Sequence, residues 1–152
     1  MFDHIAILVK DIEASRAFYT TLLATLGYKV LMTIDNSSGV HGYGKFMPQF
    51  WLAPINEDKQ GPPSQRVHIA FSAKNRAQVD AFYETGLKAG GKSNGAPGVR
   101  KEYHRFYYGC FLYDLDGNNI ECVCHWPLTL LYLTSWPAIV GGAGKIVFEY
   151  WN

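Results

Sequence analysis

Three side chains at matching places in the chain are of the types that ligate a divalent metal. His4 and His68 each open an apolar stretch and are each followed by Ile-Ala, and Glu121 lies between Ile120 and Cys122 in a strand-like run. In an alternating strand Glu121 points to the face opposite Ile120 and Cys122, where a buried carboxylate needs a cation or a hydrogen-bond donor. Two imidazoles and one carboxylate suit Fe(II), Mn, Ni or Zn with open positions for a substrate. The alternative is that Glu121 lies on a solvated face and that the histidines only cap the sheet.

The 64-residue spacing between His4 and His68 belongs to a longer internal repeat. A shift of 64 residues aligns ten identities over the 24 positions 4–27, where chance gives roughly one or two. Two similar units, each with one face to bury, are expected to pair around a cleft where equivalent positions converge. His4 and His68 are such positions, which strengthens the prediction of a metal site with Glu121.

Each half of the repeat is predicted to run strand, helix and further strands. The first half has a strand at 4–10, a helix after the N-cap Asp11, a strand at 28–34 and strands within 42–53, with Pro48 at an edge or a bulge. Residues 56–65 are expected to be a linker. The second half repeats the strand at 68–74 and the helix after Asn75, followed by a loop at 93–98 and a hairpin that turns at 116–119. The predicted helical stripes are Phe18, Leu22 and Leu26 in the first half and Val79, Phe82 and Leu87 in the second.

These motifs resemble the vicinal oxygen chelate superfamily, which includes glyoxalases, bleomycin-resistance proteins and extradiol dioxygenases. The resemblance covers residues 1 to about 126 and is carried by the segments 3–5, 15–19, 67–71 and 114–121. Within the superfamily the chain is most similar to a glyoxalase-like subgroup without an assigned activity, through segments 42–44, 50–52, 95–100 and 107–109. The resemblance implies an α+β fold of paired βαβββ modules, residues 1–55 and 66–126, forming a curved mixed sheet around a cleft. It also implies metal ligands at His4, His68 and Glu121.

The chain departs from the glyoxalase pattern at the fourth metal ligand. Glyoxalase I enzymes carry Glu, Gln or His on the last strand of the first module, and the alignment of that strand with the Glu121 strand places Trp51 there. Gln49, two residues earlier on the same face, is the nearest substitute. A weaker site, a three-ligand site or no metal site follows.

The function implied is that of a small metal-dependent lyase, isomerase or dioxygenase acting on a small substrate with vicinal oxygens. The alternative is a metal-free binding protein of the bleomycin-resistance type, which Trp51 favours, and an extradiol ring-cleavage enzyme is a third option. Glu121, His104 and Tyr107 are the candidate catalytic residues, because a nearby acid or base has to move a proton. Trp51, Arg100, Tyr103 and Tyr108 are the candidate substrate-binding residues, with Arg100 placed to clamp a carboxylate or an enediolate. Their alternative roles are solvated loop charges and sheet packing.

Composition limits the remaining classes. A formal net charge of +1 gives no electrostatic case for binding nucleic acid or an anionic membrane. The three cysteines fall within one hairpin and are expected to be reduced thiols, which with no signal peptide predicts a cytoplasmic protein. Proteins with this duplication commonly form homodimers, with modules sometimes exchanged, and a homodimer is expected.

The tail from 127 to 152 lies outside the family resemblance. Residues 125–144 contain no Asp, Glu, Lys or Arg, yet Pro127, Pro137 and the glycines argue against a continuous membrane-spanning helix. The tail is expected to cover the domain or a dimer partner rather than to enter a membrane.

Overall fold

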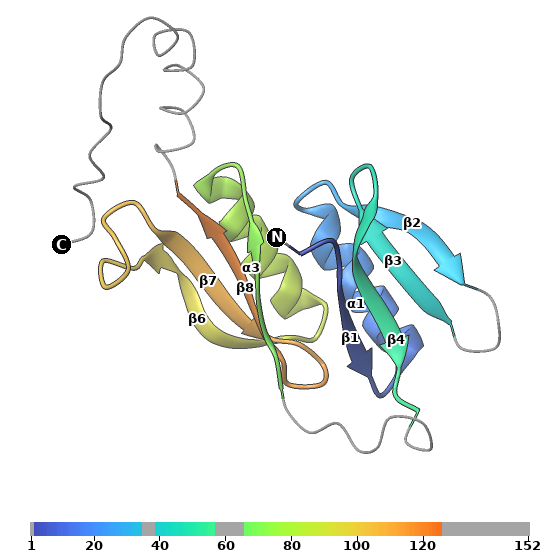
Figure 1. The fold of residues 1–152 in the computed structure, drawn as a ribbon. Helices are drawn as coiled ribbons and strands as arrows, with labels where there is room; N and C mark the ends of the chain where they lie inside the picture. The colour runs from blue at the N-terminus through green and yellow to red at the C-terminus, as the bar shows by residue number, and fades with distance from the viewer. Residues whose placement is uncertain (1, 35–38, 57–65, 126–152) are drawn as a thin grey trace, which may run out of the picture.

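The chain forms two modules with the same order of elements (Figure 1). The computed structural model describes residues 2–34, 39–56 and 66–125. The first module comprises β1 (Ile5–Val9), α1 (Ile12–Ala24), β2 (Lys29–Ile34), β3 (Val40–Gly44) and β4 (Pro48–Pro54). The second comprises β5 (His68–Ser72), α3 (Arg76–Lys88), β6 (Lys92–Val99), β7 (Tyr108–Tyr113) and β8 (Asn119–Cys124). The predicted α+β fold of paired βαβββ modules is confirmed. Residues 57–65 of the linker expected at 56–65, and the whole of the tail expected at 127–152, lie outside the described residues.

Each module contributes one four-stranded mixed sheet, and neither sheet closes into a barrel. The strand orders are β1-β4-β3-β2 and β5-β8-β7-β6, with the first and last strands of each module parallel and the others antiparallel. In Figure 1, β2 and β6 form the outer edges of the molecule, and both helices lie nearer its middle. The helices cover one face of each sheet, and among the described residues no helix lies on the other face, here called the open face.

The register of the strands confirms the internal repeat. Ala6 of β1 lies opposite Trp51 of β4, and Ala70 of β5, 64 residues later, lies opposite Glu121 of β8. Trp51 therefore occupies, in the first module, the position of Glu121 in the second. The predicted bulge at Pro48 is also present, because the pairing of β3 with β4 shifts register just before Gly44 meets Pro48.

Both helices begin at the predicted N-caps. The Asp11 carboxylate accepts the Ala14 N–H at 2.9 Å, and the Asn75 side chain accepts the Gln78 N–H at 2.9 Å. Each cap satisfies a backbone donor that has no partner inside the helix.

The predicted apolar stripe of α3 is wrong at its last residue. Leu87 is 39 % exposed, and Gly86 is the buried residue of that turn. A Cβ at Gly86 would lie 2.3 Å from Cδ1 of Leu112, so the missing side chain lets the helix approach β7 closely.

The predicted loop at 93–98 is instead part of β6. The segment pairs with β7, with register shifts at Gly95 and Gly98, and Gly95 has a φ of +157°. Because β6 is an edge strand, it accepts Pro97 and two glycines that a central strand would exclude.

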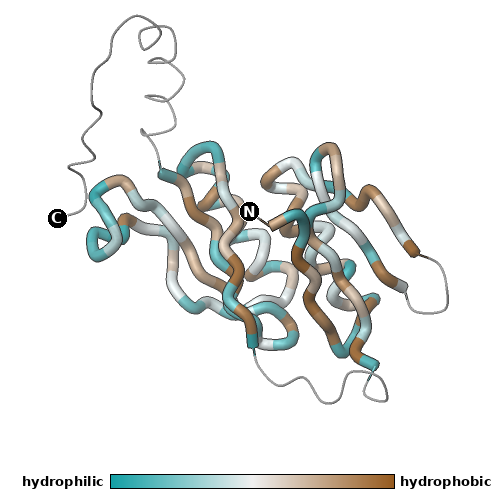
Figure 2. Tube along the Cα trace, viewed as in Figure 1, coloured by the Kyte–Doolittle hydropathy of each residue, from teal (hydrophilic) through white to brown (hydrophobic). Residues whose placement is uncertain are grey.

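One hydrophobic core joins the two modules. The rings of Phe50 and Phe71, one from each module, pack at 5.3 Å, and the Tyr19 hydroxyl donates to Asp114 at 2.6 Å. Apolar segments concentrate along the inner strands, whereas polar segments lie mainly in the turns (Figure 2). Burial raises the pKa of the Tyr19 phenol well above its ordinary value. The Tyr19 hydroxyl therefore keeps its proton and remains the donor to Asp114.

The three cysteines are buried, and none of them forms a disulfide within the described residues. Burial raises the pKa of the Cys110 thiol to about 12 and also raises that of Cys122, so both remain thiols at neutral pH. No helix in the described part of the chain is long and apolar enough to cross a membrane.

Candidate functional site

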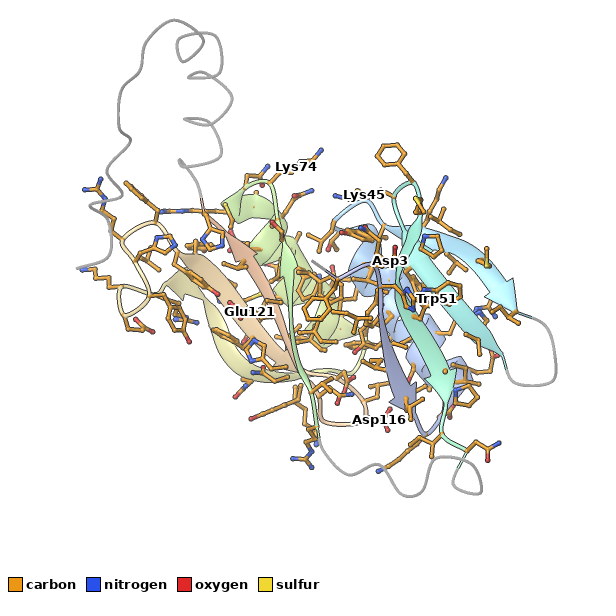
Figure 3. All side chains as sticks on the ribbon, in the orientation of Figure 1. Asp3, Lys45, Trp51, Lys74, Asp116 and Glu121 are labelled. Atoms are coloured by element: carbon orange, nitrogen blue, oxygen red, sulfur yellow. The ribbon has the colours of Figure 1, made fainter. Side chains whose placement is uncertain are left out.

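Glu121 is a buried carboxylate on the open face of the second sheet (Figure 3). Its side chain lies opposite Phe111 of β7 and Ala70 of β5, and the residue is 3 % exposed. The Tyr107 hydroxyl donates to Oε1, and Nε2 of His68 lies 2.9 Å from Oε2. The predicted need for a partner is met by two donors, which offset the cost of burying the charge.

The hydrogen bonds around His68 identify which ring nitrogen carries the proton. Nδ2 of Asn119 donates to Nδ1 of His68 at 2.8 Å, and Nδ2 of Asn94 donates to Oδ1 of Asn119 at 3.0 Å. Since Nδ1 accepts, the neutral imidazole carries its proton on Nε2 and donates it to Glu121. The two asparagines therefore orient the ring toward the carboxylate.

His68 and Glu121 have the geometry of two neighbouring metal ligands. Their facing atoms are 2.9 Å apart, and two cis ligands with bonds of about 2.1 Å lie about 3 Å apart. Metal binding would require the His68 proton to move to Nδ1 and the Asn119 amide to turn its oxygen toward it, an ordinary arrangement around a metal-bound histidine. The spacing of His68 and Glu121 thus suits two of the three ligands of the predicted metal site.

The third predicted ligand, His4, is not beside this pair in a single chain. His4 precedes β1 and its Nδ1 lies 2.8 Å from the Asp3 carboxylate, with its side chain 57 % exposed. Across the described ranges, no group of three or more His, Cys, Asp or Glu side chains is close enough to hold a metal. The metal site of His4, His68 and Glu121 stays a prediction.

The position equivalent to Glu121 in the first module is filled by an indole. A Cβ on Gly42 would lie 2.8 Å from the Trp51 ring, so the ring packs closely against that glycine. Gln49, the possible fourth ligand, is exposed on β4. Trp51 thus presents an aromatic surface on the open face of the first sheet (Figure 3).

Tyr107 reaches Glu121 because the connection between β6 and β7 folds back on itself. The Arg100 N–H donates to the Tyr107 carbonyl at 2.8 Å, and the rings of Tyr103 and Tyr107 pack at 4.7 Å. Burial and the hydrogen bond to Glu121 raise the pKa of Tyr107, so its hydroxyl is a donor at neutral pH. Tyr103 itself is 57 % exposed.

Arg100 lies on the same open face, over Phe111. Its Nη2 donates to the Ala96 carbonyl at 2.6 Å, and its guanidinium carbon is 5.4 Å from the centre of the Phe111 ring. The Phe111 ring also meets His68 edge-on at 6.2 Å. Within the described part of the chain Arg100 forms no ion pair, so its remaining N–H groups are available to an anionic group.

Tyr108, predicted to bind substrate, lies apart from this group. Its hydroxyl donates to Asp80 of α3 at 2.7 Å and its ring stacks with Arg76, on the helix-covered side of the sheet. Strand alternation explains the separation, because Tyr107 and Tyr108 point to opposite sides.

His125 joins the site although it was not among the predicted site residues. Its Nδ1 lies 2.9 Å from Nε2 of His104, the two rings stack, and the Tyr107 ring meets both edge-on. Residues 121, 123 and 125 share one face of an extended segment, so the alternation that placed Glu121 on the open face also places His125 there.

The comparisons with known proteins agree with this fold. The family model described as the Glyoxalase/Bleomycin resistance protein/Dioxygenase superfamily matches residues 1–122. A glyoxalase/bleomycin resistance protein from Albidiferax ferrireducens is 30 % identical, with a TM-score of 0.65, over 82 % of this chain and 98 % of that one.

Two more distant structures share the fold alone. A glyoxalase/bleomycin resistance protein/dioxygenase family enzyme from Burkholderia phytofirmans is 19 % identical, with a TM-score of 0.65, over 80 % of this chain and 96 % of that chain. A lactoylglutathione lyase from Agrobacterium tumefaciens is 16 % identical, with a TM-score of 0.56, over 84 % and 96 %. No curated protein matches the chain. From the family match and the fold together, the chain belongs to the glyoxalase/bleomycin resistance protein/dioxygenase superfamily.

Proposed function

We propose that this chain is a small metal-dependent enzyme of the glyoxalase or dioxygenase type that acts on a small substrate with vicinal oxygens. The supporting observation is the pair of facing ligand atoms, Nε2 of His68 and Oε2 of Glu121, 2.9 Å apart on the open face. His68, Glu121 and His4 would hold Fe, Mn, Ni or Zn. Such an ion polarises a carbonyl or enolate oxygen, or binds O2, when bound.

The neighbouring residues have defined tasks in this proposal. Tyr107 engages Oε1 of Glu121 and leaves Oε2 directed at His68, and Asn119 fixes the His68 ring. Arg100 binds an anionic part of the substrate. The Phe111 ring contacts both the Arg100 guanidinium and the His68 ring, and it forms an apolar wall of the site. The substrate class is therefore a small anion, such as a carboxylate with a neighbouring carbonyl or hydroxyl.

The third ligand is proposed to come from the first module of a second copy. His4 begins β1 as His68 begins β5, and its half-exposed ring is accessible to another chain. A homodimer in which unlike modules face each other would place His4 of one copy over His68 and Glu121 of the other. Such a pairing would also cover both open faces.

Metal content tests the proposal. Full-length protein purified without chelator is expected to carry about one divalent ion per chain, measured by plasma mass spectrometry, and to be dimeric by light scattering. His4→Ala, His68→Ala and Glu121→Gln should each lose most of the metal, whereas Glu84→Gln, which neutralises an exposed carboxylate on α3, should retain it. A parent protein that holds no metal and takes up none on dialysis would contradict the proposal.

Trp51 favours a second candidate, a metal-free binding protein of the bleomycin-resistance type. An indole replaces a ligand at the position equivalent to Glu121 and offers a flat apolar surface supported by Gly42. The probe is metal-free bleomycin, added to chelator-treated protein in a calorimeter. Micromolar binding that Trp51→Ala weakens at least tenfold would support this candidate, and heat equal to dilution would exclude it for that ligand.

A further inference from the structure

The pair His104 and His125 lies on the open face beside Glu121. Nε2 of His104 and Nδ1 of His125 are 2.9 Å apart, and the rings are stacked at an interplanar angle of 24°. The Tyr107 ring lies edge-on to both, with centroid distances of 5.4 and 5.0 Å, while its hydroxyl is bonded to Glu121. The pair and the carboxylate are thus on two sides of one tyrosine.

The hydrogen bonds around His104 and His125 determine which nitrogen of each ring carries the proton. The Phe106 N–H donates to Nδ1 of His104 at 3.2 Å, so that nitrogen accepts and the His104 proton is on Nε2. His104 Nε2–H then donates to Nδ1 of His125, which leaves the His125 proton on Nε2. His104 thus fixes the tautomer of His125, as a hydrogen-bonded neighbour commonly does for an active-site histidine.

The neutral form is the one compatible with this arrangement. A proton added to His125 would go to Nδ1 and would face the His104 N–H, which breaks the contact. The ionisable groups around His125 are His104 and Tyr107 from the β6–β7 connection and Glu121 from β8. Partial burial and the neighbouring His104 lower the pKa of His125, in agreement with a neutral ring at pH 7.

We propose that His125 is a further substrate-binding residue, whose neutral Nε2–H donates to an oxygen of the small anion bound at the Glu121 site. His104 is a positioning residue that acts through His125. This inference rests on the proposed function, and it adds a hydrogen-bond donor beside Tyr107, whose hydroxyl is bonded to Glu121.

Oxalate, a small dianion with vicinal oxygens, is the probe. On the full-length protein, long-range ¹H–¹⁵N spectra should show both His104 and His125 as Nε2–H tautomers, and oxalate should shift the His125 signals more than those of His104. Calorimetry should give an oxalate Kd about tenfold weaker for His125→Phe, the loss expected for one hydrogen bond to an anion. His125→Gln, whose amide nitrogen reaches the position of Nε2, should bind within about threefold of the parent.

The His104 variants separate positioning from packing. His104→Phe should mix the His125 tautomers and weaken oxalate, and His104→Gln, which keeps a donor, should restore both. All variants are compared only after their thermal melts agree with the parent. An Nδ1–H tautomer of His125, a parent that does not bind oxalate, or an affinity unchanged in His125→Phe overturns the inference. Metal content, measured on the same samples, tests the proposed function separately, because the tautomer assignment does not depend on it.

Discussion

Loss of the Tyr107 hydroxyl is expected to destabilise the protein because it leaves one oxygen of a buried carboxylate without its donor. In Tyr107→Phe, Oε1 of Glu121 loses the hydroxyl, and the residue is too buried, at 3 % exposure, for water to replace it freely. A hydrogen bond to a charged group contributes about 1.5–3 kcal/mol, so the free energy of unfolding should fall by that amount.

The charge on Glu121 determines the size of this effect. In a Glu121→Gln background the acceptor is neutral, and the same Tyr107→Phe change should cost about 0.5–1.5 kcal/mol. The double-mutant cycle therefore predicts a coupling energy of roughly 1–2 kcal/mol between Tyr107 and Glu121. Tyr103→Phe is the matched control, because its exposed hydroxyl forms no side-chain hydrogen bond within the described residues, and it should change stability by less than about 0.5 kcal/mol.

Urea unfolding followed by circular dichroism measures these energies, and the melting temperature of Tyr107→Phe should fall by roughly 5–10 °C. All four members of the cycle need the same m-value for the comparison to hold. A Tyr107→Phe variant as stable as Tyr103→Phe, or an equal cost in both backgrounds, would refute the assignment of Glu121 as a carboxylate held by Tyr107.

Three further outcomes follow from the structure. Tyr19→Phe removes the hydroxyl that donates to buried Asp114 across the two modules, and urea unfolding should show a loss of about 1.5–3 kcal/mol. Gly42→Ala places a Cβ 2.8 Å from the Trp51 ring, so tryptophan fluorescence should report a displaced indole, with an unchanged spectrum contradicting the described packing. Because the pKa of His125 is lower in the folded chain, the unfolded chain binds its proton first as the pH falls. The contribution of neutral His125 to the free energy of unfolding is therefore complete above pH about 6.5 and is lost as the pH falls below this value. The pH dependence of the unfolding free energy should differ between the parent and His125→Gln below pH about 6.5.

Patterns local in sequence predicted the repeated part of the fold well. The helix starts at Asp11 and Asn75 depend on one side chain and a backbone group three residues later, so they could be inferred from the sequence. The placement of Trp51 at the position equivalent to Glu121 came from aligning the last strands of the two modules, as the family resemblance implies, and the strand register agrees with it. Glu121 was identified as a residue in need of partners because an acid in an apolar strand is costly.

The errors arose where tertiary contacts override composition. Gly86 rather than Leu87 is buried because β7 passes close to α3, which no helical periodicity indicates. The segment 93–98 has the composition of a loop but pairs at a sheet edge, where glycine and proline are tolerated. Tyr108, a predicted substrate-binding residue, follows Tyr107 in the chain, and strand alternation directs it to the other face, where its hydroxyl donates to Asp80.

The site itself could be predicted in part. Tyr107 and Arg100 were predicted as site residues because a phenol can transfer a proton and a guanidinium can bind an anion. Their contacts with Glu121 and Phe111 could not be predicted, because these depend on how the β6–β7 connection folds. His125 was not among the predicted site residues because it was considered only as the start of the stretch 125–144 without charged residues, although two more steps of strand alternation from Glu121 reach it. His4 shows the limit of a repeat, because equivalence of position does not bring two histidines together within one chain.

The most direct test of the central claim is the position of a bound metal. Crystals of the full-length protein grown with Mn(II) or Zn(II) would give an anomalous difference map. We expect a peak within about 2.0–2.2 Å of Nε2 of His68 and Oε2 of Glu121, with His4 of a second copy as the third ligand. A map with no peak at this pair, or with the ion bound elsewhere, would contradict a metal-dependent function at Glu121.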